Sequence, residues 1–389
     1  MIGHAVLSPS KANQWLHCTP SVMLESEFPD LGSDYAREGT VAHELAALKV
    51  EKHFTPMKLS TYNARLKEIK KTKFYGAEME RHTDSYLQFI KELAYSFPTA
   101  PVVRVETKVD LSKYIPEGFG TADCILISGN TLYVIDFKYG VRVGVEAEGN
   151  EQMMLYGLGA YEFFNLIYDI KHVHMTIYQP RIEKAPSATV SIEDLLHWAE
   201  EFVRPRALLA WEGKGELAPS EETCRWCRAK GSCVARANMI LSAFEQVQPE
   251  ASVDPRLLTP TRKGEILTLV KGFDKWIKDL EESALTDILT GETVPGYKAV
   301  EGRSNRRITD EKVAVKRLKD AGFKTSVLYE RKLIGMTALE KLVGKKELAD
   351  LIGEYIEKPQ GKPTLVEESD KRPPYEAEKP NVEELFSNL

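Results

Sequence analysis

The stretch that decides the fold reads GTADCILISGNTLYVIDFK and covers residues 120–138. Two runs rich in Ile, Leu and Val flank Gly129-Asn130, and this pattern predicts two antiparallel strands joined by a tight turn. Counting back from the turn places Asp123 directly opposite Asp136. Opposed residues of an antiparallel pair have Cβ atoms within about 4.5–5.5 Å. Two carboxylates this close repel each other unless a cation lies between them.

Outward from this hairpin, the sequence alternates between helical and strand periodicity. Helices are expected at about 41–54, 63–95, 151–165 and 192–211, and strands at about 102–109, 123–127, 131–138 and 172–179. This order predicts an α/β fold with a mixed central β-sheet flanked by helices. Beyond about Pro255, an amphipathic helix to Leu289 begins a charged, α-rich C-terminal extension. From Gly361 onward, the Pro- and Glu-rich chain is expected to be extended or disordered at its end.

Length and charge narrow the class of protein. A chain of 389 residues is longer than one typical domain. The net charge of −6 argues against a protein that coats nucleic acid by bulk electrostatics, but it leaves room for a local basic groove. No apolar run approaches a membrane span, and the N-terminus lacks the pattern of a signal peptide. We therefore expect a cytoplasmic protein with no membrane partner.

The hairpin also carries an amine. Lys138 lies two residues beyond Asp136, so strand alternation points both side chains to the same face. A carboxylate pair that binds a divalent ion, with an ammonium group beside it, suits phosphodiester hydrolysis. Gln152 and Tyr156 share one helix face at a spacing of i, i+4 and are expected to brace Lys138 or to contact the substrate backbone.

Two further residues are candidates for the same site. His43 falls in the first turn of the helix expected from Val41 and would complete the shell of a metal ion. Glu106, on the preceding strand, either replaces a carboxylate or only shapes the neighbourhood. Each feature is ordinary by itself, because Asp-X-Lys is very common and a helical His is more often a surface or core residue.

The order of these motifs over residues 5–235 resembles that of the RecB-like nucleases of the PD-(D/E)XK superfamily. The resemblance implies a restriction-endonuclease-like core and the following roles. His43, Asp123, Asp136 and the backbone carbonyl of Phe137 would hold Mg²⁺ or Mn²⁺, Lys138 would be catalytic, and Gln152 and Tyr156 would support substrate binding. A nitrogen ligand among carboxylates keeps Mn²⁺ open beside Mg²⁺.

Three cysteines, Cys224, Cys227 and Cys233, fall within ten residues and predict a metal site. Cys18 is the candidate for the fourth ligand, and its Trp-Leu-His-Cys context resembles the N-terminal cysteine segment of AddB and CRISPR-associated RecB-like nucleases. That resemblance implies a structural 4Fe-4S cluster. The spacing alone leaves Zn²⁺ open, with His17 as an alternative ligand. Cys124 is expected to be a small core residue.

The C-terminal region adds a basic cluster. Arg303, Arg306 and Arg307 are candidate DNA contacts, although a solvated loop explains them equally well. The chain carries no phosphate-binding loop of a helicase motor, so any unwinding would come from a separate helicase or single-strand-binding protein. The Ser-Pro-Ser segment at 8–10 and the stretch Gly361–Leu365 resemble those of an uncharacterised family found in phages and prophages.

The sequence therefore predicts a nuclease domain at 1–245 with a four-cysteine staple, and an α-rich region at 255–389 with a flexible tail. The expected activity is that of a metal-dependent DNA exonuclease acting on single-stranded or end-containing DNA in phage-type replication or recombination. Two alternatives remain: a non-catalytic, zinc-containing DNA-binding or recombination-mediator protein, and a sequence-specific endonuclease.

Overall fold

The computed structural model describes residues 5–30, 32–140, 144–245, 260–302, 304, 306–329, 333–359, 361–367 and 370–375. The chain divides into two compact units, residues 1–255 and 256–389, and each has its own buried core. No helix in these described ranges has both the length and the apolar character needed to cross a lipid bilayer.

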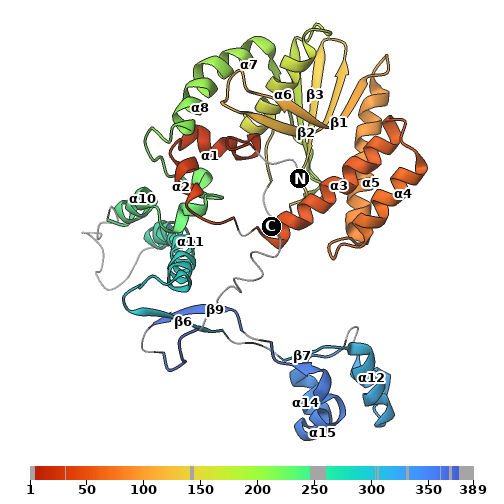
Figure 1. The fold of residues 1–389 in the computed structure, drawn as a ribbon, viewed down its shortest axis with the longest axis vertical. Helices are drawn as coiled ribbons and strands as arrows, with labels where there is room; N and C mark the ends of the chain where they lie inside the picture. The colour runs from red at the N-terminus through yellow and green to blue at the C-terminus, as the bar shows by residue number, and fades with distance from the viewer. Residues whose placement is uncertain are drawn as a thin grey trace, which may run out of the picture. The chain divides into compact units, whose positions relative to one another are not determined.

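The first unit is built on a five-stranded sheet (Figure 1). Its strands, in spatial as well as chain order, are β1 (Val102–Asp110), β2 (Phe119–Ser128), β3 (Thr131–Phe137), β4 (His172–Tyr178) and β5 (Ser187–Ser191). All neighbours are antiparallel except β3 and β4, which are parallel and are connected through helix α6 (Glu151–Phe164). The predicted mixed sheet is confirmed. Strand β5 was not predicted, because its short Ser-Ala-Thr-Val-Ser sequence gains strand structure from pairing with β4.

The predicted hairpin register is confirmed. Ser128 pairs with Thr131, and the ladder runs without a shift to Cys124 opposite Ile135. Gly129 has φ +59°, the left-handed conformation that a tight hairpin turn requires and that glycine adopts without strain. The next position along this register places Asp123 opposite Asp136.

Helices cover both faces of the sheet (Figure 1). One face packs against α3 (Asp34–Phe54), α4 (Leu59–Lys70) and α5 (Ala77–Ser96). The other face packs against α6 and against a C-terminal run made of α7 (Ile192–Trp198), a π-helical turn (Ala199–Val203) and α8 (Arg204–Trp211). The two cores contain Leu45, Ile90 and Leu126 on the first face, and Val134 and Leu155 on the second.

Two predicted helices have different bounds in the structure. Helix α3 begins at Asp34, because the Ser33 side chain caps it by accepting the Ala36 backbone N–H. His43 therefore lies in its third turn and not in its first. The single helix predicted at 63–95 is two helices, α4 and α5, because the chain leaves helical geometry before Gly76, a weak helix former.

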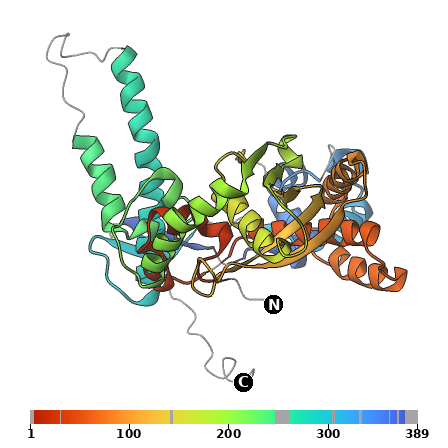
Figure 2. The same cartoon turned by 90° about the horizontal axis from the view of Figure 1, so that it is seen from above.

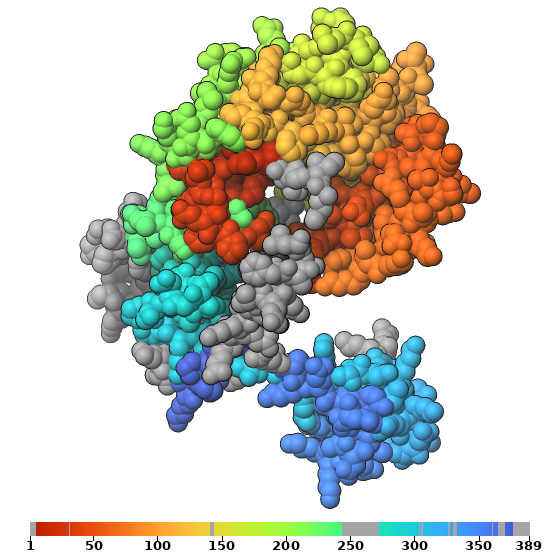
Figure 3. Space-filling view, viewed as in Figure 1, coloured from red at the N-terminus to blue at the C-terminus, as the bar shows by residue number. Residues whose placement is uncertain are grey.

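The N-terminal segment lies beside the cysteine-rich segment, as the adjoining red and green surfaces of Figure 3 show. The elements involved are the 3₁₀ turn Pro9–Lys11, α1 (Ala12–His17), α2 (Ser21–Ser26), α9 (Glu221–Cys224), the 3₁₀ turn Arg228–Gly231 and α10 (Val234–Glu245). The Thr19 hydroxyl donates to the Lys214 carbonyl oxygen at 2.7 Å. The Arg228 backbone N–H donates to the buried Glu25 carboxylate at 2.7 Å. These bonds join positions that are about two hundred residues apart in sequence.

The second unit contains the long helix α11 (Pro260–Thr290; blue-green in Figure 2) and two small antiparallel pairs. Strand β6 (Tyr297–Glu301) pairs with β9 (Pro363–Glu367), and β7 (Arg307–Ile308) pairs with β8 (Ile356–Glu357). Helices α12 (Glu311–Asp320), α13 (Thr325–Leu328), α14 (Met336–Val343) and α15 (Lys345–Ile352) enclose a small core. Strand β9 shows that the predicted extended segment after Gly361 takes part in pairing.

Candidate metal and catalytic site

The backbone of β1 is distorted where it meets Asp123. Val105 pairs with Cys124 and Thr107 pairs with Ala122, so the register is the same on both sides of Glu106. Glu106 itself does not pair, and its φ of +47° lies in the left-handed region. This conformation costs a non-glycine residue about 1–3 kcal/mol and is found most often at functional sites.

The distortion brings three potential metal ligands together. One ligand atom each from His43, Glu106 and Asp123 lies within 4.8 Å of the others. His43 Nδ1 is 3.2 Å from Asp123 Oδ1. One imidazole and two carboxylates are a suitable donor set for Mn²⁺ or Mg²⁺. The sequence left the role of Glu106 open, and the structure groups it with His43 and Asp123, while Asp136 falls outside this group of three.

Asp136 belongs to a hydrogen-bonded network with Lys138 and helix α6. The Gln152 amide donates to Asp136 Oδ1 and to the Tyr156 hydroxyl, both at 3.2 Å. Lys138 Nζ donates to Gln152 Oε1 at 3.0 Å and lies 3.1 Å from Asp136 Oδ2. The predicted bracing contact between Gln152 and Lys138 is therefore present. Asp136 is 2% exposed, so the Lys138 ammonium is the charge that balances this buried carboxylate.

Phe137 links the ligand group to this network. Its backbone N–H donates to Asp123 Oδ2 at 2.7 Å, which fixes the carboxylate whose other oxygen faces His43. Its ring meets the His43 imidazole edge-on, with centroids 5.4 Å apart. Phe137 thus holds two of the three ligand side chains in place.

Protonation in this site follows from burial and from the clustered charges. Desolvation of the carboxyl, reinforced by the charge of Asp123, raises the pKa of Glu106 to about 7, although the residue as a whole is exposed to solvent. Burial opposes protonation of His43, but the Asp123 carboxylate outweighs it and the pKa of His43 rises. Burial raises the pKa of Asp136, whereas for Asp123 the His43 contact and the Phe137 N–H overcome burial and lower the pKa. At neutral pH the ligand group therefore holds protons that a cation would displace.

Tyr86 is a residue of this site that the sequence did not reveal. It lies on α5 at helical spacing with Met79, Thr83 and Ile90, which indicates only a core face. In the structure it lines one small pocket together with the three ligand residues. Burial, followed by the charges of its neighbours, raises its pKa well above the ordinary value.

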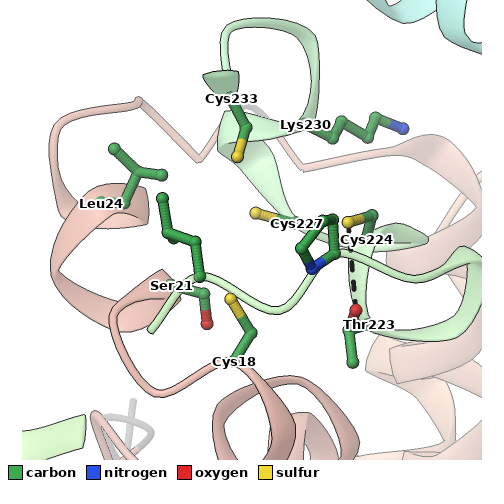
Figure 4. A pocket seen from close by; sticks show the side chains of 10 residues that line it. Cys18, Ser21, Leu24, Thr223, Cys224, Cys227, Lys230 and Cys233 are labelled. Atoms are coloured by element: carbon green, nitrogen blue, oxygen red, sulfur yellow. Dashed lines mark hydrogen bonds between the residues drawn. The ribbon is translucent and has the colours of Figure 1, made fainter. Parts of the chain in front are cut away.

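The four predicted cysteine ligands also meet. Cys18, Cys224, Cys227 and Cys233 line one pocket and form no disulfide (Figure 4). Burial raises the pKa of Cys18 and takes that of Cys227 to about 12, to which the Glu25 carboxylate contributes. Without a cationic partner, both of these thiols stay protonated at neutral pH.

The distances between the sulfur atoms help to distinguish a site for one zinc ion from a site for a larger group. A tetrahedral zinc site with Zn–S bonds of about 2.3 Å places its sulfurs roughly 3.8 Å apart, yet no three of these four sulfurs lie within 4.8 Å of one another. The wall also offers hydrogen-bond donors. The Ala218 N–H donates to Cys18 Sγ at 3.4 Å, and the buried Ser21 hydroxyl has no partner within the described part of the chain. The separation of the sulfurs therefore favours a group larger than one ion, and the wall offers that group hydrogen-bond donors.

His17, the alternative zinc ligand, is not part of this pocket wall. Its Nε2 atom lies 2.6 Å from Glu151 Oε1 instead. Cys124 is fully buried in the core between α3, α5 and the sheet, as predicted.

The basic cluster of the C-terminal region is partly engaged in ion pairs. Arg306 pairs with Glu340, and Arg307 Nη2 lies 3.3 Å from Glu357 Oε2. Arg303 lies outside the described residues. A phosphate that binds Arg306 or Arg307 would have to compete with these carboxylates.

Comparison with known proteins gives a family match and weak structural similarities, of which two are described here. The model of a family described as "Protein of unknown function (DUF2800)" matches residues 4–373. A solved structure titled "Crystal structure of SSO0001" is 12% identical, with a TM-score of 0.31, over 61% of this chain and 89% of that one. A structure of LHK-Exo in complex with dAMP is 16% identical, with a TM-score of 0.23, over 44% of this chain and 91% of that one. Both TM-scores are below 0.5, and neither similarity identifies a function for this chain.

Proposed function

This chain belongs to the DUF2800 family, and from the geometry of its site we propose that it is a metal-dependent DNA nuclease of the PD-(D/E)XK type. The observation that carries the proposal is the meeting of two arrangements at one end of the hairpin. His43, Glu106 and Asp123 form a ligand group for a divalent ion. Beside it, Lys138 is held by Asp136 and Gln152. A structural core would need neither the strained Glu106 nor a brace for a partly exposed ammonium.

The chain's own groups would have separate roles in phosphodiester hydrolysis. When bound, Mg²⁺ or Mn²⁺ would polarise the phosphate and lower the pKa of a water molecule. Lys138 would place its positive charge where negative charge develops on the phosphate. Gln152 would fix the Lys138 amine, and Tyr156 would fix Gln152. Asp136 would orient Lys138 through its Oδ2 atom, which lies 3.1 Å from the ammonium, while its Oδ1 atom accepts the Gln152 amide.

We propose that the four cysteines bind a 4Fe-4S cluster with a structural role. The separation of the sulfurs supports a cluster over a single Zn²⁺. The cluster would join α1 to the segment at 224–233, next to the contacts that Thr19 and Glu25 already make. Zinc remains the alternative outcome of a metal analysis.

The substrate is proposed to be DNA that is single-stranded or offers an end, and the reaction to be exonucleolytic in phage-type replication or recombination. The choice of this substrate and reaction is supported by the resemblance of the motif order to that of RecB-like nucleases. A separate helicase or single-strand-binding protein would supply opened strands. Endonucleolytic cleavage at specific sequences and DNA binding without cleavage are the competing outcomes.

Cleavage of end-labelled DNA tests the proposal. Single- and double-stranded substrates, labelled at either end, are incubated with Mn²⁺, Mg²⁺ or EDTA, using the wild-type chain and Lys138→Ala. We expect metal-dependent, progressive shortening by the wild type and loss of cleavage in the variant. Discrete fragments would indicate an endonuclease. DNA binding without cleavage under every metal condition would refute the enzyme assignment, and iron and zinc analysis of the same sample would test the cluster.

A further inference from the structure

The Tyr86 hydroxyl is a buried polar group without a partner. The side chain is 2% exposed, and its Oη atom makes no hydrogen bond to any residue that the structure describes. The ring is held between Phe137 and Tyr178, with centroid distances of 4.9 and 5.5 Å. The position of the hydroxyl is therefore set by packing and not by a hydrogen bond.

Tyr86 is part of the wall of the ligand pocket, and the charges of Asp123 and Glu106 act on its hydroxyl. The other polar residues of that wall are His43, Glu106 and Asp123. A buried donor without a partner destabilises a fold, and phenylalanine would pack in the same space without that cost. The presence of tyrosine at this position indicates a partner that arrives with a ligand.

We propose that the Tyr86 hydroxyl donates a hydrogen bond to a water molecule in the hydration shell of the ion held by His43, Glu106 and Asp123. This inference rests on the proposed metal site and adds a positioning residue to it. A phenol is protonated at neutral pH and can donate. Direct ligation by a phenolate is disfavoured, because the pocket already contains two carboxylates and a third, Asp136, lies nearby.

The role differs from that of Tyr156, the other tyrosine near the site. The Tyr156 hydroxyl accepts the Gln152 amide and so belongs to the Lys138 network. Tyr86 lies on the opposite face of the sheet, in the core that contains Leu45 and Phe137. The two hydroxyls therefore act on the site from different sides.

Titration of Mn²⁺ into the metal-depleted full chain, followed by electron paramagnetic resonance without DNA, tests the inference. Tyr86→Phe is expected to weaken Mn²⁺ binding by about 10- to 100-fold, the usual effect of removing an outer-shell hydrogen bond. Tyr133→Phe is the matched control, because Tyr133 packs against Phe97 and His174 at a different place on the same face. It is expected to bind Mn²⁺ as the wild type does.

Thermal melting separates this role from a purely structural one. Without divalent ions, Tyr86→Phe should melt at or above the wild-type temperature, because it removes an unpartnered buried hydroxyl. With Mn²⁺ the order should reverse. Wild-type Mn²⁺ affinity in Tyr86→Phe, or a lower melting temperature in the metal-free variant, would overturn the inference.

Variants of two proposed metal ligands distinguish failure of the metal site from failure of the role proposed for Tyr86. If Asp123→Asn and His43→Ala bind Mn²⁺ as the wild type does, the proposed metal site itself is wrong. If both lose Mn²⁺ binding while Tyr86→Phe retains it fully, only the role of Tyr86 is wrong.

Discussion

Replacing Cys18 with alanine should remove one ligand of the group that joins the N-terminal helices to the cysteine-rich segment and so lower the stability of the first unit. The group bound by the four cysteines would close a loop of about two hundred residues, from Cys18 to Cys224. For a loop of this length, the chain-entropy relation gives roughly 5 kcal/mol of stabilisation. If the group is lost on unfolding, its binding free energy acts in the same direction.

The non-covalent contacts limit the damage in Cys18→Ala. The Thr19 bond to Lys214 and the Glu25 bond to Arg228 do not involve the thiol, so the fold should persist. In a unit of about 250 residues, each kcal/mol shifts the melting temperature by roughly 2–4 °C. We therefore expect Cys18→Ala to melt about 10–20 °C below the wild type.

Thermal melting followed by circular dichroism, with iron and zinc analysis of the same samples, measures this effect. Cys124→Ala is the matched control, because it removes a buried thiol that does not line the pocket. It should keep its metal content and lose only about 1 kcal/mol, as ordinary core substitutions do. Full metal content and an unchanged melting temperature in Cys18→Ala would refute the proposed staple.

Three further outcomes are expected. Lys138→Ala should lower the rate of DNA cleavage in the end-label assay by at least about 10²-fold, while DNA binding in a gel-shift assay stays intact. Near-normal cleavage would remove Lys138 from the mechanism. Gln152→Ala should lower kcat more than it changes KM, because Lys138 loses the acceptor that fixes it, and a pure KM effect would contradict this. Mn²⁺ affinity should fall as the pH falls from 8 to 6, by about tenfold for each proton that the ion displaces. The reason is that Glu106, with a pKa of about 7, and His43, with a raised pKa, then bind protons. An Mn²⁺ affinity independent of pH would show that these groups are not ligands.

The parts of the site that local pattern determines were predictable from the sequence. The Gly129-Asn130 turn fixed the register, and the register placed Asp123 opposite Asp136. Strand alternation placed Lys138 beside Asp136, and helical spacing placed Gln152 and Tyr156 on one face. Each of these relations spans no more than twenty residues and depends on one periodicity.

Other features depend on tertiary contacts, which the hydrophobic periodicity of one helix or strand does not encode. The left-handed backbone at Glu106 arises where β1 meets Asp123 and is not visible in the sequence of the strand. Tyr86 has the spacing of a core residue because it is one, and only packing brings its hydroxyl to the ligand pocket. Strand β5 forms through its pairing with β4 despite a weak propensity of its own.

The three acidic residues of the site lie at corresponding positions on three neighbouring strands. Glu106 on β1 lies between residues that pair with the two neighbours of Asp123 on β2, and continuing the β2–β3 register places Asp123 opposite Asp136. Lys138 offsets one of these charges through its pair with Asp136, which leaves Glu106 and Asp123 to be balanced. In the absence of a metal, protons on Glu106 and His43 supply that balance, as their raised pKa values indicate. A divalent ion supplies the same two charges, so metal and protons should compete for one half of the site while the Lys138 half keeps its arrangement.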